Sequence, residues 1–98
     1  MLKKTYSRTG QICRATFILP PEVDASSVYL VGDFNEWDMA SIPMRRYYDG
    51  SFSITLSLDA NNDYRFRYWL DGERWENDWA ADAYVPNGKG SDDSVIRV

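Results

Sequence analysis

The stretch Ser51-Phe52-Ser53-Ile54-Thr55-Leu56-Ser57-Leu58 decides the fold class of this chain. Its apolar and hydroxyl-bearing side chains alternate without a break. In an extended strand, successive side chains point to opposite sides, so every apolar side chain here faces one way. The pattern therefore predicts a strand with one face on a core and the other toward water.

The same alternation recurs along most of the chain. Asp63–Asp71 places Tyr64, Phe66, Tyr68 and Leu70 inward and Arg65, Arg67 and Trp69 outward. The polar turn between these two segments predicts a hairpin. Further strands are expected over Ile12–Leu19, Val28–Val31, Met44–Tyr48 and Ser94–Val98. Only Asn77–Ala83 resembles a helix, and it is short enough to be a single turn. Six or seven short strands separated by turn signals predict an antiparallel β-sandwich.

Length and charge exclude several classes of protein. The chain has 98 residues, enough for one domain, whereas a (β/α)₈ barrel needs about 250. Its net charge of −4 argues against binding to nucleic acid or to an anionic membrane. The N-terminus lacks the apolar stretch of a signal peptide, and no apolar run reaches the ~20 residues of a membrane span. We therefore expect a cytoplasmic, monomeric domain over residues 10–98 with an N-terminal extension, residues 1–9. Residues 1–9 and 85–91 are expected to be the most flexible.

Catalytic and metal-binding signals are weak. There is no His, and Cys13 alternates with apolar residues, which indicates an inert buried thiol. Most carboxylates fall in predicted turns, where aspartate is common because it accepts bonds from nearby backbone N–H groups. Asp92–Asp93 and Asn77–Asp78 offer oxygen ligands, but the spacing of a calcium loop is absent. We predict no catalytic residue, no metal site and no cofactor.

The aromatic residues are more informative. The chain has 4 Trp, 7 Tyr and 4 Phe, more rings than so small a core can hold. Trp37 lies in a predicted loop, Trp75 lies just past a turn, and Trp69 and Arg67 share the outward face of a strand. A flat indole suits the apolar face of a sugar ring, and a neighbouring Arg can bond hydroxyls at its edge. The alternative is that each Trp caps the core.

Several motifs, in order, resemble a known family. Val28-Tyr29-Leu30-Val31-Gly32-Asp33-Phe34-Asn35-Glu36-Trp37 is similar to the V-x-L-x-G-x-F-N-x-W signature of glycogen-binding modules. These are the carbohydrate-binding modules of family 48, the early-set domains of isoamylases and glycogen branching enzymes. The same domain occurs in the beta subunit of AMP-activated protein kinase. The similarity continues through Leu70-Asp71-Gly72-x-x-Trp75 and Gly90-Ser91-Asp92-Asp93-Ser94-Val95, so it spans roughly residues 10–98. It implies an all-β, immunoglobulin-like antiparallel β-sandwich of early-set type with six to eight short strands.

The resemblance also implies a glycan site. By position, Trp37 and Trp75 match the two family tryptophans, with one extra residue before Trp75, and Arg67 matches the basic residue between them. Ser91 and Asp93 match positions that bond sugar hydroxyls. Lys89 stands where the kinase subunits carry an apolar residue, and Asp93 where they carry an amide. The candidate carbohydrate-binding residues are Trp37, Arg67, Trp69, Trp75, Lys89, Ser91 and Asp93.

Three interpretations remain at this point. The first is a stand-alone, non-catalytic module that binds α-1,4-glucan such as glycogen or starch. The second is a module of the same fold whose glycan site has weakened and which docks on a glucan-active enzyme or another protein. The third, a small hydrolase, lacks support because the chain is too short for the catalytic barrel.

Overall fold

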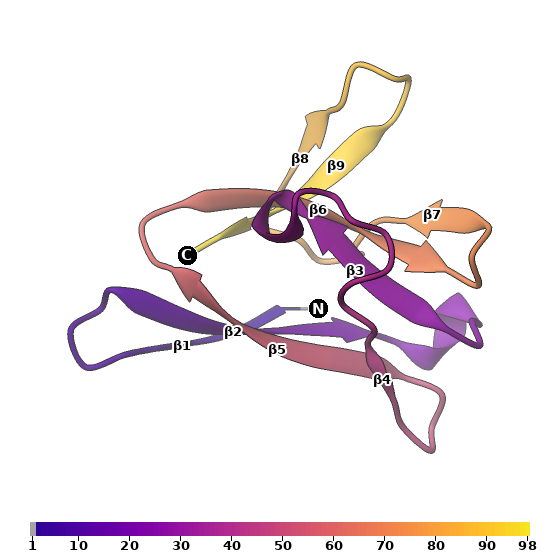
Figure 1. The fold of residues 1–98 in the computed structure, drawn as a ribbon, viewed down its shortest axis with the longest axis horizontal. Coiled ribbons are helices and arrows are strands. Elements are labelled where there is room, and N and C mark those ends of the chain that lie inside the picture. The colour runs from indigo at the N-terminus through magenta and orange to yellow at the C-terminus, as the bar shows by residue number, and fades with distance from the viewer. Residues whose placement is uncertain (1) are drawn as a thin grey trace.

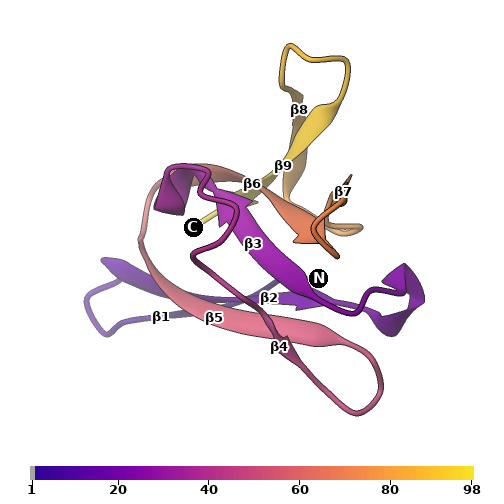
Figure 2. The ribbon, with the colours of Figure 1, turned by 45° about the vertical axis from the view of Figure 1, so that its right-hand side comes forward.

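A computed structural model describes residues 2–98 as two antiparallel sheets packed face to face (Figures 1 and 2). The first sheet has the strand order β1-β2-β5-β4. The second has the order β3-β6-β9-β8, and β7 also pairs with β6. The strands are β1 (Leu2–Tyr6), β2 (Ile12–Leu19), β3 (Val28–Gly32), β4 (Arg45–Arg46), β5 (Phe52–Asp59), β6 (Asp63–Leu70), β7 (Arg74–Glu76), β8 (Ala83–Pro86) and β9 (Asp92–Arg97). The predicted all-β antiparallel sandwich is confirmed.

The alternating segment 51–58 forms most of β5, which pairs with β2 along its whole length. Their register runs from Ile12 opposite Asp59 to Leu19 opposite Phe52. Ile54 and Leu56 point toward the core as expected but are only half-buried. The reason is that β4 pairs only with Ser53 and Phe52, so the rest of β5 lies at the edge of its sheet.

The core is made of the inward faces of both sheets. Phe17 and Phe66 meet edge to face at its centre, with ring centroids 5.0 Å apart, and Phe66 makes a similar contact with Tyr68 at 5.7 Å. Such aromatic pairs stabilise a fold beyond the area that they bury. Cys13 is fully buried, as expected from its place in the alternation.

Three strands were not predicted from the sequence. Residues 2–6, placed in the predicted extension and expected to be flexible, form β1 and pair with β2. Strands β7 and β8 are short, and neither shows a clear alternation. The predicted strand at Met44–Tyr48 is reduced to the two residues of β4. Asn77–Ala83 contains a turn and no helix. The predicted hairpin between β5 and β6 is wrong, because the two strands belong to different sheets and the polar turn between them crosses from one sheet to the other.

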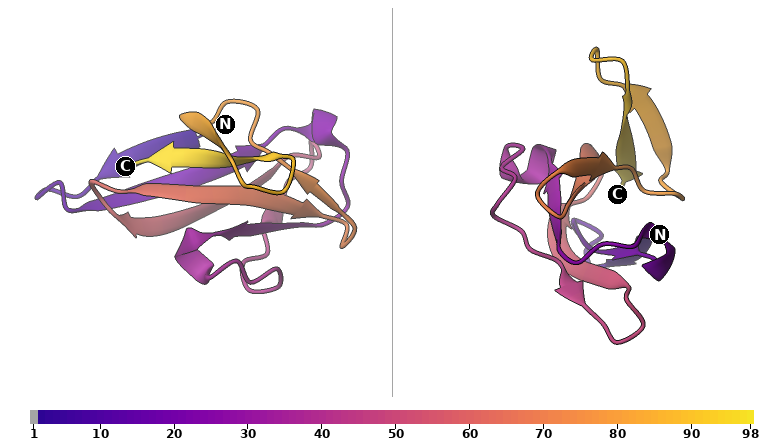
Figure 3. Two further views of the ribbon diagram at one scale, coloured as in Figure 1. Left: turned by 90° about the horizontal axis from the view of Figure 1, so that it is seen from above. Right: turned by 90° about the vertical axis from the view of Figure 1, so that its right-hand side faces the viewer.

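Strand β1 is also connected to the second sheet. Lys4 Nζ lies 2.6 Å from Asp82 Oδ2, and the same oxygen accepts the backbone N–H of Arg97 at 2.8 Å. Asp82 directly precedes β8, so this carboxylate links the edge strand of one sheet to two strands of the other. Figure 3 shows the β8–β9 hairpin extending beyond the body of the sandwich.

Along one of its two edges, β6 pairs first with one strand and then with another. On one side, β6 pairs with β3 throughout residues 66–70. On the other, Asp63–Phe66 pair with β9 and Tyr68–Leu70 pair with β7. Arg67 is the residue between the two pairings, at the point where β7 and β9 separate. We call this place the fork.

Residues 2–98 lack both a membrane-spanning helix and a metal-binding cluster. They contain no helix of the length and apolar character needed to cross a bilayer. They also contain no group of three or more His, Cys, Asp or Glu side chains arranged to hold a metal ion.

Candidate carbohydrate-binding site

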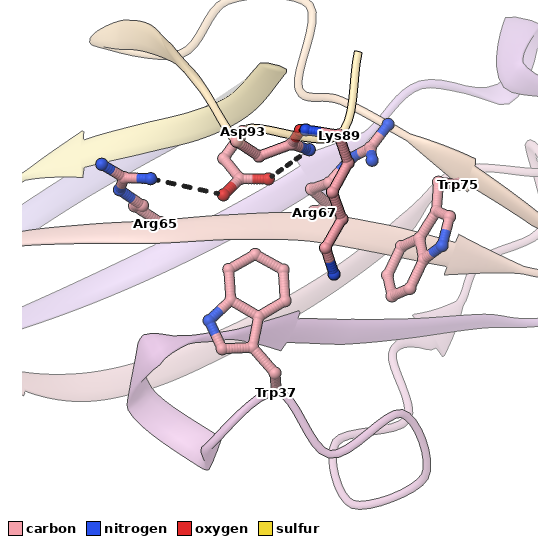
Figure 4. A pocket seen from close by; sticks show the side chains of 7 residues that line it. Trp37, Arg65, Arg67, Trp75, Lys89 and Asp93 are labelled. Atoms are coloured by element: carbon pink, nitrogen blue, oxygen red, sulfur yellow. Dashed lines mark hydrogen bonds and ion pairs between the residues drawn. The ribbon is translucent and has the colours of Figure 1, made fainter. Parts of the chain in front are cut away.

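A pocket of about 310 Å³ opens on the outer face of the second sheet, at the fork. It is lined by Trp37, Arg65, Arg67, Trp75, Asn87, Lys89 and Asp93. Figure 4 shows the two indoles on either side of it, with the charged side chains between and above them. Its walls come from three parts of the chain: the turn after β3, the β6–β7 hairpin, and the β8–β9 hairpin.

Trp37 is held by a tight turn that follows β3. The short 3₁₀ turn Asp33–Asn35 leads into Glu36 and Trp37, both with left-handed backbone angles (φ 57° and 59°). The Trp37 backbone N–H donates to Gly32 O at 2.9 Å, and its indole Nε1 donates to Asp33 Oδ1 at 2.9 Å. The other oxygen of Asp33 accepts the backbone N–H of Arg65 at 2.8 Å, which attaches the turn to β6.

Asn35 holds the same turn closed. Its side-chain oxygen accepts the Gly32 N–H, while its Nδ2 donates to Asp38 O and to Ser41 Oγ. The Gly-x-Phe-Asn-x-Trp segment is therefore a hydrogen-bonded unit that presents one indole at the pocket.

Trp75 forms the opposite wall. It lies opposite Trp69 across the β6–β7 pairing, and the two ring centroids are 4.6 Å apart. The Arg67 guanidinium carbon sits 5.5 Å from the centre of a Trp75 ring, within the range of a cation–π contact. Trp69 thus supports Trp75 from below, and Trp75 remains 36% exposed.

Arg67 is incompletely hydrogen-bonded. Its Nε is buried and has no acceptor among residues 2–98. Its Nη1 reaches Ser91 Oγ only at 3.5 Å, which is long for a hydrogen bond. Because Nε is buried, the donor capacity that Arg67 retains at the floor of the pocket lies in its Nη groups.

The loop between β8 and β9 closes the third side. Asn87 Nδ2 donates to Ser91 Oγ at 2.9 Å and lies 3.3 Å from Asp93 Oδ1. The Lys89 backbone N–H donates to Asn87 Oδ1, and Figure 4 shows the Lys89 side chain extending toward the space between the indoles. Asp93 is 6% exposed, and its Oδ2 lies 3.9 Å from Arg65 Nη1.

A buried polar network supports this side of the site from within the sandwich. Tyr68 donates to Asp78 Oδ2 at 2.7 Å, and Ser94 Oγ accepts the Asp78 N–H and donates to Asn77 Oδ1. Burial raises the pKa of the Tyr68 hydroxyl well above its ordinary value, and the Asp78 carboxylate adds to that rise. Tyr68 therefore stays a hydrogen-bond donor, and the network fixes the segment between β7 and β8.

The structure gathers most of the predicted site residues. Trp37, Arg67, Trp75, Lys89 and Asp93 line one pocket, while Ser91 and Trp69 lie directly behind lining residues. Sequence analysis missed Arg65 and Asn87. Arg65 had a signal, because it shares the outward face of its strand with Arg67. Asn87 had none, since its place depends on the β8–β9 hairpin.

The prediction that aspartates in turns accept hydrogen bonds from backbone N–H groups is confirmed for three of them. Asp38 Oδ1 accepts the Ala40 N–H, Asp78 Oδ1 accepts the Ala80 N–H, and Asp71 Oδ1 accepts two N–H groups, from Ser26 and Ser27. The bonds from Ser27 and Ser26 lower the pKa of the Asp71 carboxyl. Asp38 and Asp78 thus stabilise their own turns, whereas Asp71 links the turn after β6 to the segment before β3.

Comparison with known proteins identifies the family. Residues 23–85 match the model of carbohydrate-binding module 48 (isoamylase N-terminal domain), which is more than half of the chain. Over 67 residues, or 66% of its length, the chain is 36% identical to the 1,4-alpha-glucan branching enzyme GlgB of Aquifex aeolicus (strain VF5). The match spans only 10% of that enzyme. The match to the family model covers the signature turn, Arg67 and both tryptophans of the pocket, and the chain belongs to the carbohydrate-binding module 48 family.

Proposed function

We propose that this chain is a non-catalytic module that binds α-1,4-glucan, such as glycogen or starch, in the pocket at the fork. One observation carries the proposal: Trp37 and Trp75, 38 positions apart in the sequence, line the same open pocket with hydrogen-bonding side chains between them. The family and the branching-enzyme relative support the class of ligand.

The chemistry of the pocket suits a pyranose. Each indole offers a flat apolar face to the C–H side of a glucose ring, and stacking of this kind is worth about 1 kcal/mol beyond buried area. Arg67 Nη1 makes only a long contact to Ser91 Oγ and can turn to a sugar hydroxyl, and Asn87 and Ser91 place an amide and a hydroxyl at the rim. In this proposal, the tryptophans carry the affinity and the polar groups set the orientation of the sugar.

A titration with maltoheptaose or β-cyclodextrin tests the proposal on the isolated chain. We expect a dissociation constant between about 1 µM and 1 mM, because a few contacts must offset the entropy of ordering a flexible sugar. Tryptophan fluorescence and NMR shifts at Trp37 and Trp75 should report the binding.

Two alanine variants locate the site. Trp37→Ala and Trp75→Ala should each weaken binding about tenfold, the loss of one stacking platform with its buried area. Trp79→Ala is a matched control, because Trp79 is 55% exposed and does not line the pocket. If millimolar glucan leaves Trp37 and Trp75 unmoved, the glucan proposal fails. Docking on a glucan-active enzyme would then become the leading interpretation.

A further inference from the structure

The pocket carries more positive charge than a neutral glucan requires. Three of its lining residues, Arg65, Arg67 and Lys89, are cationic, and only Asp93 is anionic. The chain as a whole has the opposite balance, with 15 acidic and 11 basic residues. The lining of the pocket therefore has a local excess of positive charge, although the protein as a whole is acidic.

Most of this charge is not neutralised by the protein. Arg65 has a partner in Asp93, at 3.9 Å. Within residues 2–98, neither Arg67 nor Lys89 forms an ion pair with a carboxylate. Arg67 also has the buried Nε without an acceptor. Two cationic side chains thus face the same pocket without a counter-charge.

Such an arrangement favours an anionic group on the ligand. Like charges held together repel each other, and an anion bound between them relieves the repulsion. A phosphate monoester carries a charge of about −1.5 to −2 at pH 7 and three strong acceptor oxygens. A guanidinium bonds such oxygens through its planar fork, and an ammonium binds them as a point charge.

We propose that the pocket prefers an α-glucan that carries a phosphate monoester on a glucose hydroxyl. The proposal rests on the glucan-binding function proposed above and adds a preference to it. Trp37 and Trp75 stack on glucose rings, while Arg67 and Lys89 hold the phosphate. Arg65 is engaged with Asp93 and contributes less.

The test compares maltoheptaose with maltoheptaose that carries one 6-phosphate, by calorimetry at matched low ionic strength. We expect the phosphorylated sugar to bind about tenfold more tightly, as one charge-assisted contact would provide. The difference should shrink in about 1 M salt, where the Debye length falls to about 3 Å. Inorganic phosphate and glucose 6-phosphate should compete only at much higher concentrations, because inorganic phosphate has no ring to stack and glucose 6-phosphate has one ring for the two indoles.

Three variants show whether the preference comes from the pocket. Lys89→Gln should reduce the ratio of the two affinities several-fold, and Lys89→Arg should retain it. Lys3→Gln is the charge-matched control: Lys3 is exposed in β1 of the first sheet, lies opposite Thr16 and is outside the pocket, so the ratio should not change.

The possible results separate this inference from the proposed function. Equal affinities for both sugars overturn the phosphate preference and leave glucan binding intact. No binding of either sugar overturns the proposed function itself. Inorganic phosphate that binds as tightly as the phosphorylated sugar overturns the preference, because the glucan would then add nothing. An oligoglutamate peptide that competes as well as the phosphorylated sugar overturns it too, in favour of an acidic protein segment.

Discussion

Gly32 shows how one missing side chain allows the site to form. Its backbone is extended, so its role is close packing. A Cβ at this position would lie 2.5 Å from the carbonyl oxygen of Arg65 and 2.9 Å from Phe66 Cβ. Only glycine lets β3 approach β6 closely enough for the turn that carries Trp37.

Gly32→Ala should therefore destabilise the domain by about 1–3 kcal/mol, the usual cost of overpacking against atoms that cannot move. Urea unfolding followed by tryptophan fluorescence measures the change. An unfolding midpoint equal to that of the wild type would show that β3 and β6 can separate without cost.

Asp33 positions the first indole. Asp33→Ala removes the acceptor of the Trp37 Nε1–H bond and that of the Arg65 N–H bond. Glucan affinity should fall several-fold while the domain stays folded, because each such bond contributes about 1 kcal/mol. Calorimetry with maltoheptaose gives the affinity.

The control for Asp33 lies in the same loop. Asp38→Ala also removes a turn carboxylate, and within residues 2–98 that carboxylate accepts the Ala40 N–H alone. Its effect on glucan affinity should be much smaller. If the two variants weaken binding equally, then general loosening of the loop, and not the indole contact, explains the loss.

At the level of the strand, burial decides how much each residue matters. Phe66 in β6 is fully buried and contacts Phe17, whereas Leu56 in β5 is half-buried. Phe66→Ala should cost about 3–5 kcal/mol, and Leu56→Ala should cost clearly less because its cavity opens to solvent. Chemical denaturation of both variants gives the comparison. A larger loss for Leu56→Ala would contradict the placement of the core.

The link between β1 and the β8–β9 hairpin should respond to pH. Partial burial raises the pKa of Asp82, but the bonds from Lys4 and from the Arg97 N–H outweigh it, so the net pKa lies below its ordinary value of 3.8. A lowered folded-state pKa stabilises the fold above the ordinary value, and this stability is lost as pH falls through the folded pKa. Unfolding of the wild type should therefore become easier below about pH 4.

Asp82→Asn should flatten that acid-dependent loss, and Lys4→Met should flatten it in part by removing the largest favourable partner. Thermal unfolding between about pH 2 and pH 6 shows the slope. Hydrogen exchange of the β1 amides tests the location: faster exchange confined to β1 and its neighbours is expected. A slope in Asp82→Asn equal to that of the wild type would assign the acid sensitivity to other carboxylates.

In the whole molecule, the described carboxylates are not arranged as a hydrolase needs them. The described carboxylates near the pocket are engaged in turns, in the buried network or with Arg65, and none faces a second carboxylate across the pocket. Glycoside hydrolysis requires two such groups across a cleft. Incubation of this chain with glycogen or amylose should release no sugar. Release that disappears in Asp93→Asn would contradict the non-catalytic assignment.

The long strands and most of the site were predictable, whereas the short strands were not. Alternation marks β2, β5 and β6 because each has one face on the core. Strand β7 has three residues, and β1 mixes Lys and Thr with apolar residues, so their pairing depends on partners that are distant in sequence. The alternation also placed Arg67 on an outward face. Its position between β7 and β9 appeared only in the structure, because it too depends on strands that are distant in sequence.

The two sides of the pocket at the fork differ in how freely their residues can be substituted. The wall that carries Trp37 is bonded to β6 and packed against it, so most substitutions at positions 32–35 will cost folding stability. The loop at positions 87–91 extends beyond the sandwich. Its glycines at 88 and 90 have left-handed backbone angles (φ 76° and 83°) that disfavour other residues, whereas Lys89 between them is exposed and lines the pocket. Ligand preference can therefore diverge by single mutations at Lys89 while the rest of the domain stays the same. The arrangement makes the β8–β9 loop the part of the protein on which selection for new ligands can act.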